Sequence, residues 1–96
     1  MVGGIETTVG LVGATIQHAA QMQDGWSKLR DAPDSVGPFI EEAIRLDGPA
    51  IGNLRRTTRA TEVAGVPLPQ GSTVALLWGS ANRDEAEFPD PDRFVM

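Results

Sequence analysis

The sequence contains no cysteine and a single histidine, His18. Without cysteine there is no disulfide framework, no thiolate metal site and no thiol nucleophile. One imidazole also excludes a metal site built from several histidines. Basic residues are few, since eight Lys and Arg stand against thirteen Asp and Glu in 96 residues, a formal charge of −5. Because phosphate neutralisation needs a clustered basic face, this balance argues against a nucleic-acid partner.

Long apolar segments are missing as well. The longest uncharged stretch, Thr7 to Gln23, is too short and too polar for a membrane span. Residues 1–6 lack the basic opening and apolar run of a secretory signal. We therefore expect a cytoplasmic protein with no membrane segment. The length allows one domain, residues 1–96, with a modest core.

Apolar spacing predicts two helices at the start of the chain. Four side chains recur at the three-to-four spacing of one helical face, namely Ile5, Val9, Val12 and Ile16. Asp24 and Gly25 interrupt this pattern, and a short second helix is expected from about Trp26 to Arg30. Pro33 closes that helix because proline disfavours helical geometry in the residue before it.

A third helix is predicted next, with Asp34 or Ser35 as its cap and its end at Asp47-Gly48-Pro49. Five apolar residues form its expected buried side: Phe39, Ile40, Ala43, Ile44 and Leu46.

The second half of the chain has a different texture. Proline and glycine in residues 64–71 predict two short extended pieces joined by a hairpin-like turn. Ser72 to Trp78 is apolar and bounded by glycines, which is typical of a strand buried on both faces. Closely spaced prolines exclude regular structure in residues 88–94. Helices first, strands second and irregular coil last give an α+β class that is mainly α.

Glu6 and Thr7, with Thr8, place a carboxylate beside hydroxyls at the start of the first helix. Such a pair can relay protons to a buried acceptor, and Gly3 and Gly4 let a ligand approach the helix closely. The alternative is structural, because a glutamate in a first helical turn interacts favourably with the helix dipole.

Glu42 and Arg45 lie three residues apart on one helix face, where they can pair. An exposed pair of this kind contributes little. A desolvated pair needs a further partner for the five donors of the guanidinium, and Arg93 in the proline-rich tail is the candidate.

Other residues allow both a functional and a structural interpretation. Arg55 or Arg56 could offer a bidentate fork to a carboxylate ligand, or form a solvated pair at a strand edge. His18 is interpreted as a surface or half-buried helix residue, and Trp26 and Trp78 as core or interface residues. A carboxylate hydrolase using Glu6 with Glu41 or Glu42 has no supporting spacing.

Taken in order along the chain, six motifs resemble the cytochrome P-450 family, the haem-thiolate monooxygenases, and in particular its soluble bacterial members. They are Gly3-Gly4-Ile5-Glu6-Thr7-Thr8, Glu42-Ala43-Ile44-Arg45, Arg55 with Thr57 and Thr58, residues 65–71, Ala81-Asn82-Arg83-Asp84, and residues 88–94. The resemblance implies a partial P-450 fold: the second half of the central helix, the Glu-x-x-Arg helix, a small β hairpin and strand region, and an irregular meander. The N-terminal part and the C-terminal cysteine loop of that fold are not represented.

The resemblance also implies roles for individual residues. Glu6 and Thr7 would belong to a proton relay, Gly3, Gly4 and Arg55 to the cofactor site, and Glu42, Arg45 and Arg93 to a structural charge triad. Arg56 is the runner-up for the arginine that contacts a haem propionate. No residue is assigned as a metal ligand.

The implied cofactor is heme b, and the implied partners are a small organic substrate and a ferredoxin- or flavin-type electron donor. The implied reaction inserts one oxygen atom of O₂ into the substrate. Because the chain has no thiolate, we expect it to be inactive alone and to bind heme poorly. The alternative is a small non-enzymatic interaction module derived from that family. Removed from its surroundings, the first helix would expose apolar residues such as Val9, Val12 and Ile16.

Overall fold

A computed structural model describes residues 3–96 of the chain. Helices come first: α1 (Glu6–Gln21), α2 (Gly25–Asp31) and, after a 3₁₀ turn over Pro33–Ser35, α3 (Val36–Asp47). Four short strands and a last helical turn follow: β1 (Asn53–Arg56), β2 (Thr61–Val63), β3 (Val66–Leu68), β4 (Thr73–Leu76) and α4 (Trp78–Ala81). No helix or strand follows α4 within the described residues. The structure therefore confirms the three predicted helices, the α+β class and the irregular tail.

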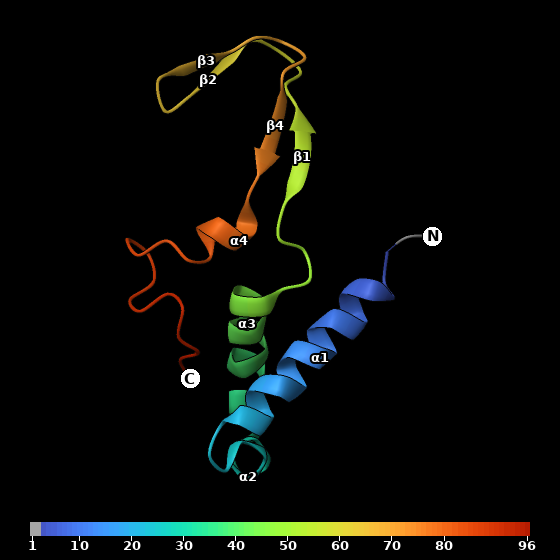
Figure 1. The fold of residues 1–96 in the computed structure, drawn as a ribbon, viewed down its shortest axis with the longest axis vertical. Coiled ribbons are helices and arrows are strands. Elements are labelled where there is room, and N and C mark those ends of the chain that lie inside the picture. The colour runs from blue at the N-terminus through green and yellow to red at the C-terminus, as the bar shows by residue number, and fades with distance from the viewer. Residues whose placement is uncertain (1–2) are drawn as a thin grey trace.

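The core of the described residues lies where α1 crosses α3 (Figure 1). Its buried apolar residues are Ala19, Phe39, Ala43 and Leu46. Three of the five residues expected on the buried side of α3 are thus buried, whereas Ile40 is half-buried and Ile44 is exposed. Figure 1 shows the remainder of α1 diverging from α3 toward the N-terminal end.

The predicted side-chain cap of α3 is wrong. Neither Asp34 nor Ser35 caps the helix, and the Ser35 hydroxyl instead donates to the carbonyl of Ala32 at 2.7 Å. The reason is local, because the 3₁₀ turn that begins at Pro33 already holds Ser35 at φ −80°, ψ −13°. A capping residue needs extended geometry to bring its oxygen to the first amides.

The strands form two separate antiparallel pairs, β1 with β4 and β2 with β3. The β2–β3 hairpin turns at Ala64 and Gly65, which both have positive φ, the backbone geometry that suits a tight two-residue hairpin turn. This confirms the predicted hairpin. The strand expected over residues 72–78 is shorter, and it is not buried on both faces, since Thr73, Ala75 and Leu76 are exposed.

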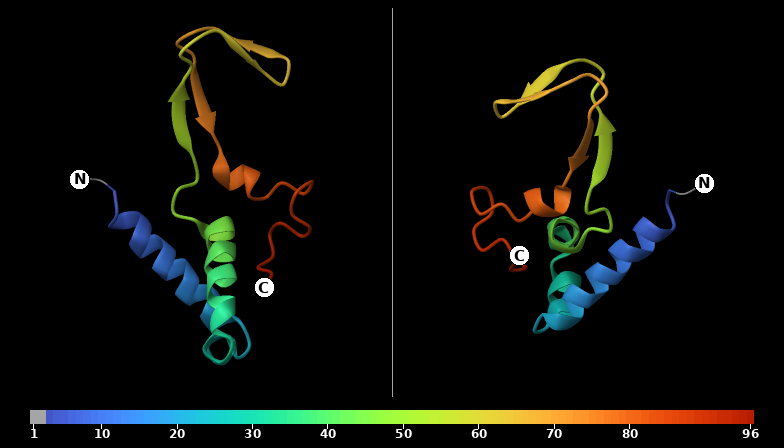
Figure 2. Two further views of the ribbon diagram at one scale, coloured as in Figure 1. Left: turned by 180° about the vertical axis from the view of Figure 1, so that it is seen from behind. Right: turned by 45° about the horizontal axis from the view of Figure 1, so that its top comes forward.

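The two sheets project away from the helices (Figures 1 and 2). The radius of gyration is 17.3 Å, against about 12–13 Å for a compact domain of this length. The accessible surface is 7331 Å², against about 5,300 Å² for a compact protein of 10.2 kDa. The chain therefore leaves roughly 2,000 Å² uncovered that a compact domain of its mass would bury.

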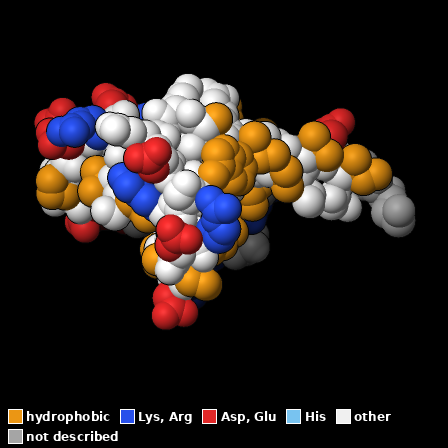
Figure 3. All heavy atoms as spheres, turned by 90° about the horizontal axis from the view of Figure 1, so that it is seen from below, with side chains coloured by type: hydrophobic (Ala, Val, Ile, Leu, Met, Phe, Trp, Pro, Cys, Tyr) orange, Lys and Arg blue, Asp and Glu red, His pale blue; other side chains and the backbone are white. Residues whose placement is uncertain are grey.

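Hydrophobic side chains occupy much of this surface. Figure 3 shows a row of them along the projecting arm that ends in the grey N-terminal residues. The exposed members on α1 and just before it are Ile5, Val9, Val12 and Ile16. Trp26 and Trp78 are also exposed, so neither packs in the core of the described residues, and the alternative that they are interface residues stays a prediction. Among residues 3–96, no helix combines the length and the apolar character needed to cross a bilayer.

Candidate functional site

The most highly connected polar side chain of the described residues is Arg45, in the last turn of α3. Its Nε and one Nη donate to the two carboxylate oxygens of Glu42 at 2.7 and 2.8 Å, a bidentate pair. Both side chains are largely buried, with 10% of Arg45 and 15% of Glu42 exposed. The i, i+3 spacing places them on one helix face, as the sequence predicted.

The remaining Arg45 donors go to backbone carbonyls of distant segments. Nη1 donates to the carbonyls of Asn82 and Pro91 at 2.8 and 2.7 Å, and Nη2 donates to that of Arg93 at 2.9 Å. All five N–H groups of the guanidinium are therefore used. This is the condition under which a desolvated arginine is tolerated, because each buried donor has an acceptor.

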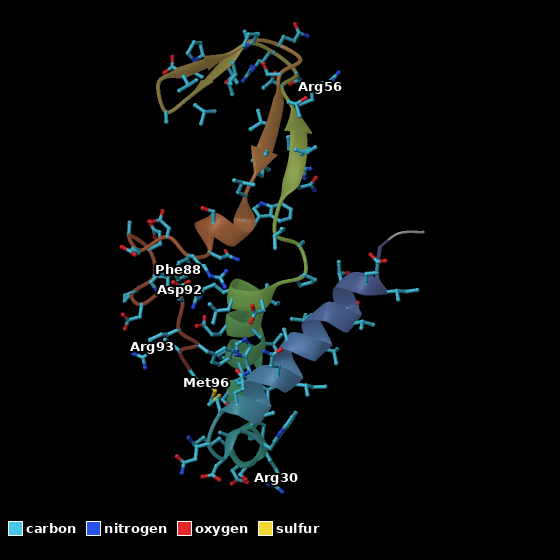
Figure 4. The ribbon with its side chains drawn as sticks, viewed as in Figure 1. Arg30, Arg56, Phe88, Asp92, Arg93 and Met96 are labelled. Atoms are coloured by element: carbon cyan, nitrogen blue, oxygen red, sulfur yellow. The ribbon has the colours of Figure 1, made fainter. Side chains whose placement is uncertain are left out.

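Two further contacts complete the cluster around Arg45. The Arg45 guanidinium carbon lies 5.1 Å from the centre of the Phe88 ring, within cation–π range. The Glu42 Oε1 also accepts the Val95 amide at 2.9 Å. Glu42 and Arg45 thus bind α3 to the turn after α4 and to the C-terminal segment, residues 91–96. Figure 4 labels Arg93 and Met96 of this segment, and Phe88 before it.

The electrostatics of the pair follow from these contacts. The hydrogen bonds from Arg45 hold the pKa of Glu42 below its ordinary value of 4.5, against the opposing effect of burial, and the Val95 amide lowers it further. In return, the hydrogen bonds to Glu42 raise the pKa of Arg45. Both groups are charged in the folded state at neutral pH.

Arg93 joins this cluster by its backbone and not by its side chain. Its guanidinium is 77% exposed, lies 3.6 Å from Asp90 and points away from α3 (Figure 4). The expected triad of charged side chains is therefore not assembled within the described residues. The physical reason is that a guanidinium has no acceptor, so it cannot satisfy the donors of Arg45, whereas a carbonyl can. Sequence reasoning missed the carbonyls of Asn82 and Pro91, because a backbone acceptor leaves no signal in residue types.

The expected relay residues lie at the start of α1, where this helix diverges from α3 (Figure 1). Glu6 and Thr7 begin α1 and are exposed, and Gly3 and Gly4 precede the helix, where an added Cβ would meet no atom within 4 Å. Thr7 lines an open, mostly apolar cavity of about 540 Å³ between α1 and α4. Its lining residues are Thr7, Thr8, Leu11, Ile44, Gly48, Pro49, Ala50, Trp78, Ala81 and Asn82. The structure does not place Glu6 in this lining.

Arg55 and Arg56 lie on the exposed β1 strand, away from both of these regions. Arg55 donates to the neighbouring carbonyl of Leu54 at 3.1 Å. Figure 4 places Arg56 at the far end of the sheet region and Arg30 at the opposite end of the molecule. The basic side chains labelled there do not share one face.

His18 is half-buried, as predicted. Its Nε2 lies 2.7 Å from Asp47 Oδ2, and its ring stacks on Phe94 with 4.3 Å between centroids. Within the described part of the chain, no three His, Cys, Asp or Glu residues are arranged to hold a metal ion.

Comparison with known proteins places this geometry in a family. The family model for Cytochrome P450 matches residues 36–96, which include the Glu42–Arg45 pair and all the segments bound to it. The chain belongs to the cytochrome P450 family. Haem is the cofactor of this family, and its members are monooxygenases.

Bacterial P450s are among the relatives of this chain in sequence. Cytochrome P450 144 of Mycobacterium tuberculosis is 40% identical over 93 residues, which are 97% of this chain and 21% of that protein. The biotin biosynthesis cytochrome P450 of Bacillus subtilis is 37% identical over 93 residues, 97% of this chain and 24% of the relative. The chain thus spans between a fifth and a quarter of the length of these two relatives.

Solved P450 structures give the same result for the fold. CYP109B1 from Bacillus subtilis superposes with a TM-score of 0.85 at 34% identity, over 98% of this chain and 26% of the other. P450BioI, solved in complex with an acyl carrier protein ligated to hexadec-9Z-enoic acid, gives 0.82 at 37% identity, over 94% and 24%. This confirms the expected partial P450 fold.

The residues of this chain do not by themselves fit a haem iron. The family's ligand is a thiolate, and the sequence has no cysteine. Its one imidazole is bound to Asp47 and stacked on Phe94. Among the thioethers, which are neutral, those of Met22 and Met96 belong to described residues, whereas Met1 lies outside them. The sequence therefore supplies no residue that fits the thiolate ligand of this family.

Proposed function

We propose that this chain provides one part of a haem-dependent P450 monooxygenase and is inactive without the rest of that fold. The observation that carries the proposal is its uncovered surface of roughly 2,000 Å². A standard specific interface buries about 800 Å² on each partner, so this uncovered area is more than twice one partner's share. The four exposed apolar side chains from Ile5 to Ile16 and the open cavity beside α4 lie on this surface.

Within that enzyme, the relay and cofactor residues predicted from the sequence keep their proposed roles. Glu6 and Thr7 form the proton relay. Gly3 and Gly4 let the cofactor approach α1, where the structure leaves open space around both glycines. Arg55 contacts a propionate of heme b from the exposed β1 strand, with Arg56 as the alternative.

Glu42 and Arg45 are structural in this proposal, and Arg93 adds its backbone carbonyl to them. The chain as a whole contributes to a single P450 domain. The substrate is a small organic molecule, and electrons come from a ferredoxin- or flavin-type donor. We place the enzyme in the cytoplasm.

A first experiment measures the ligand of the iron. Purified chain is mixed with haem, reduced and exposed to CO, and its absorption spectrum is recorded. We expect no thiolate-type Soret band, because no residue of the chain carries a thiolate. Such a band would contradict the proposal that the chain is inactive alone.

A second experiment supplies the missing surface. The matching section of CYP109B1 from Bacillus subtilis, the relative with a TM-score of 0.85, is replaced by this chain. We expect the chimera to incorporate haem and to give the thiolate-type band. A soluble chimera that takes up no haem would contradict the proposal.

The chimera also tests the relay. Glu6→Gln and Thr7→Ala are expected to lower the product formed per reduced donor consumed by about a hundredfold, the scale of a lost proton-transfer group. Gln17→Ala on the exposed part of the same helix is the matched control and should leave this ratio unchanged. If Glu6→Gln, Thr7→Ala and Gln17→Ala all give the same amount of product per reduced donor, Glu6 and Thr7 do not form the relay.

The second candidate function is an interaction module without enzymatic activity, and the exposed apolar row on α1 also favours it. Light scattering and thermal unfolding of the purified chain separate the two. A monodisperse monomer with one sharp transition supports the module. Association or a broad transition supports the first proposal, in which the chain is one part of a larger fold.

A further inference from the structure

The C-terminal segment, residues 91–96, is held against the helices from two sides. On one side, Arg45 binds the carbonyls of Pro91 and Arg93, and Glu42 accepts the Val95 amide. These bonds join only backbone atoms of the segment to α3. They do not by themselves decide which side chain of the segment faces the core.

Phe94 makes the contact on the other side. Its ring centroid lies 4.3 Å from that of His18, with 29° between the planes, and 4.9 Å from that of the fully buried Phe39. Phe94 lies between Arg93, whose carbonyl binds Arg45, and Val95, whose amide binds Glu42. The position of the Phe94 ring is therefore coupled directly to both of these backbone bonds.

His18 is itself fixed from a third element. Its Nε2 lies 2.7 Å from Asp47 Oδ2 at the end of α3, and only 12% of its side chain is exposed. A carboxylate only accepts, so Nε2 carries the proton and donates it. This bond fixes the rotation of the ring that Phe94 stacks on. One residue of α1 thus connects the end of α3 to the C-terminal segment.

We propose that His18 is a positioning residue for the C-terminal segment. Its ring, held by Asp47, sets the place of Phe94, and Phe94 sets the register in which the segment meets Glu42 and Arg45. The inference rests on this geometry and is independent of the proposed enzymatic function.

Amide hydrogen exchange of Val95 in the full chain tests the proposal, because its amide is bonded only when the segment is in register. His18→Ala is expected to speed exchange at Val95 about tenfold or more, since it removes the ring stack and the bond to Asp47. Exchange at Ala43, in the middle of α3, should change far less. Gln17→Ala, at the neighbouring exposed position, is the control and should alter neither amide.

Two more variants separate positioning from a general effect on folding. His18→Phe keeps an aromatic ring and should recover part of the protection at Val95. Phe94→Leu leaves His18 and the helices intact and should reproduce the local loss. Unchanged exchange at Val95 in His18→Ala or Phe94→Leu would overturn the proposal. So would an equal increase at Val95 and Ala43, or no recovery in His18→Phe.

Discussion

The helical region and the sheet region of this chain are stabilised in different ways. In α1 and α3 a small apolar core forms around the fully buried Phe39, and Arg45 uses every donor of its guanidinium. In the sheets, residues 53–76, no described residue is fully buried. The strands there are held by backbone ladders and by the Thr57 hydroxyl, which donates to Pro69 and accepts from Ser72.

This difference shows which contacts the chain makes for itself. The helical region and the C-terminal segment supply their own buried apolar contacts and their own acceptors for Arg45. Two-stranded sheets without a covered face are marginal in water. The apolar side chains of the sheet region, such as Leu54 at 64% exposure, therefore depend on a surface supplied from outside these residues.

The largest expected effect tests the core directly. Phe39→Ala removes a fully buried ring and should lower the free energy of unfolding by about 3–5 kcal/mol. Leu54→Ala in β1 should change it by less than about 0.5 kcal/mol, because its side chain is already in water. Urea unfolding followed by circular dichroism measures both. Similar losses in the two variants would mean that the regions do not differ.

Arginine-to-lysine substitutions give the next largest difference. Arg45→Lys keeps the positive charge but has three donors, so at least two acceptors around it lose their partners. We expect a loss of about 2–3 kcal/mol in the free energy of unfolding. Arg55→Lys, which loses one bond at the exposed strand, should be within about 0.5 kcal/mol of the unsubstituted chain. A tolerated Arg45→Lys would show that the carbonyl contacts contribute little.

The smallest expected effect is a dependence on pH in the helical region. The folded pKa of Glu42 is depressed, so its contribution to stability is present above the ordinary value of 4.5 and is lost as pH falls toward the lowered value. The difference in urea midpoint between the unsubstituted chain and Glu42→Gln should be largest above about pH 5 and shrink below pH 4.5. A difference that is constant over this range would contradict a charged pair.

The sequence predicts where the helices and strands lie better than it predicts which of their faces are buried. Helix spacing located α1 and α3, because the 3.6-residue period depends only on the chain itself. The strand at residues 72–78 was expected to be buried, because its apolar run indicates a covered strand, yet the covering surface is not formed by the described residues. The cap of α3 failed for a similar reason, since the preceding 3₁₀ turn changes the local backbone.

The candidate site shows the same limit. The spacing of Glu42 and Arg45 predicted their pairing, but residue types carry no signal for the carbonyls of Asn82 and Pro91. Sequence reasoning selected the Arg93 side chain because it is charged. In the structure the Arg93 carbonyl contacts Arg45 instead, because the N–H groups of Arg45 require hydrogen-bond acceptors.

The sheets leave and rejoin the helical region at one narrow point. The Gly79 amide donates to the carbonyl of Ile51 at 3.0 Å, and a Cβ at Gly52 would come 2.7 Å from the carbonyl of Leu76. Residues 52–78 therefore form one long loop that contains both sheets, and its two ends are held together by these contacts. Doubling the length of such a loop adds only about 0.6 kcal/mol to the entropy cost of closing it. A change in the length of this segment therefore costs little and leaves the contacts of Arg45 in place.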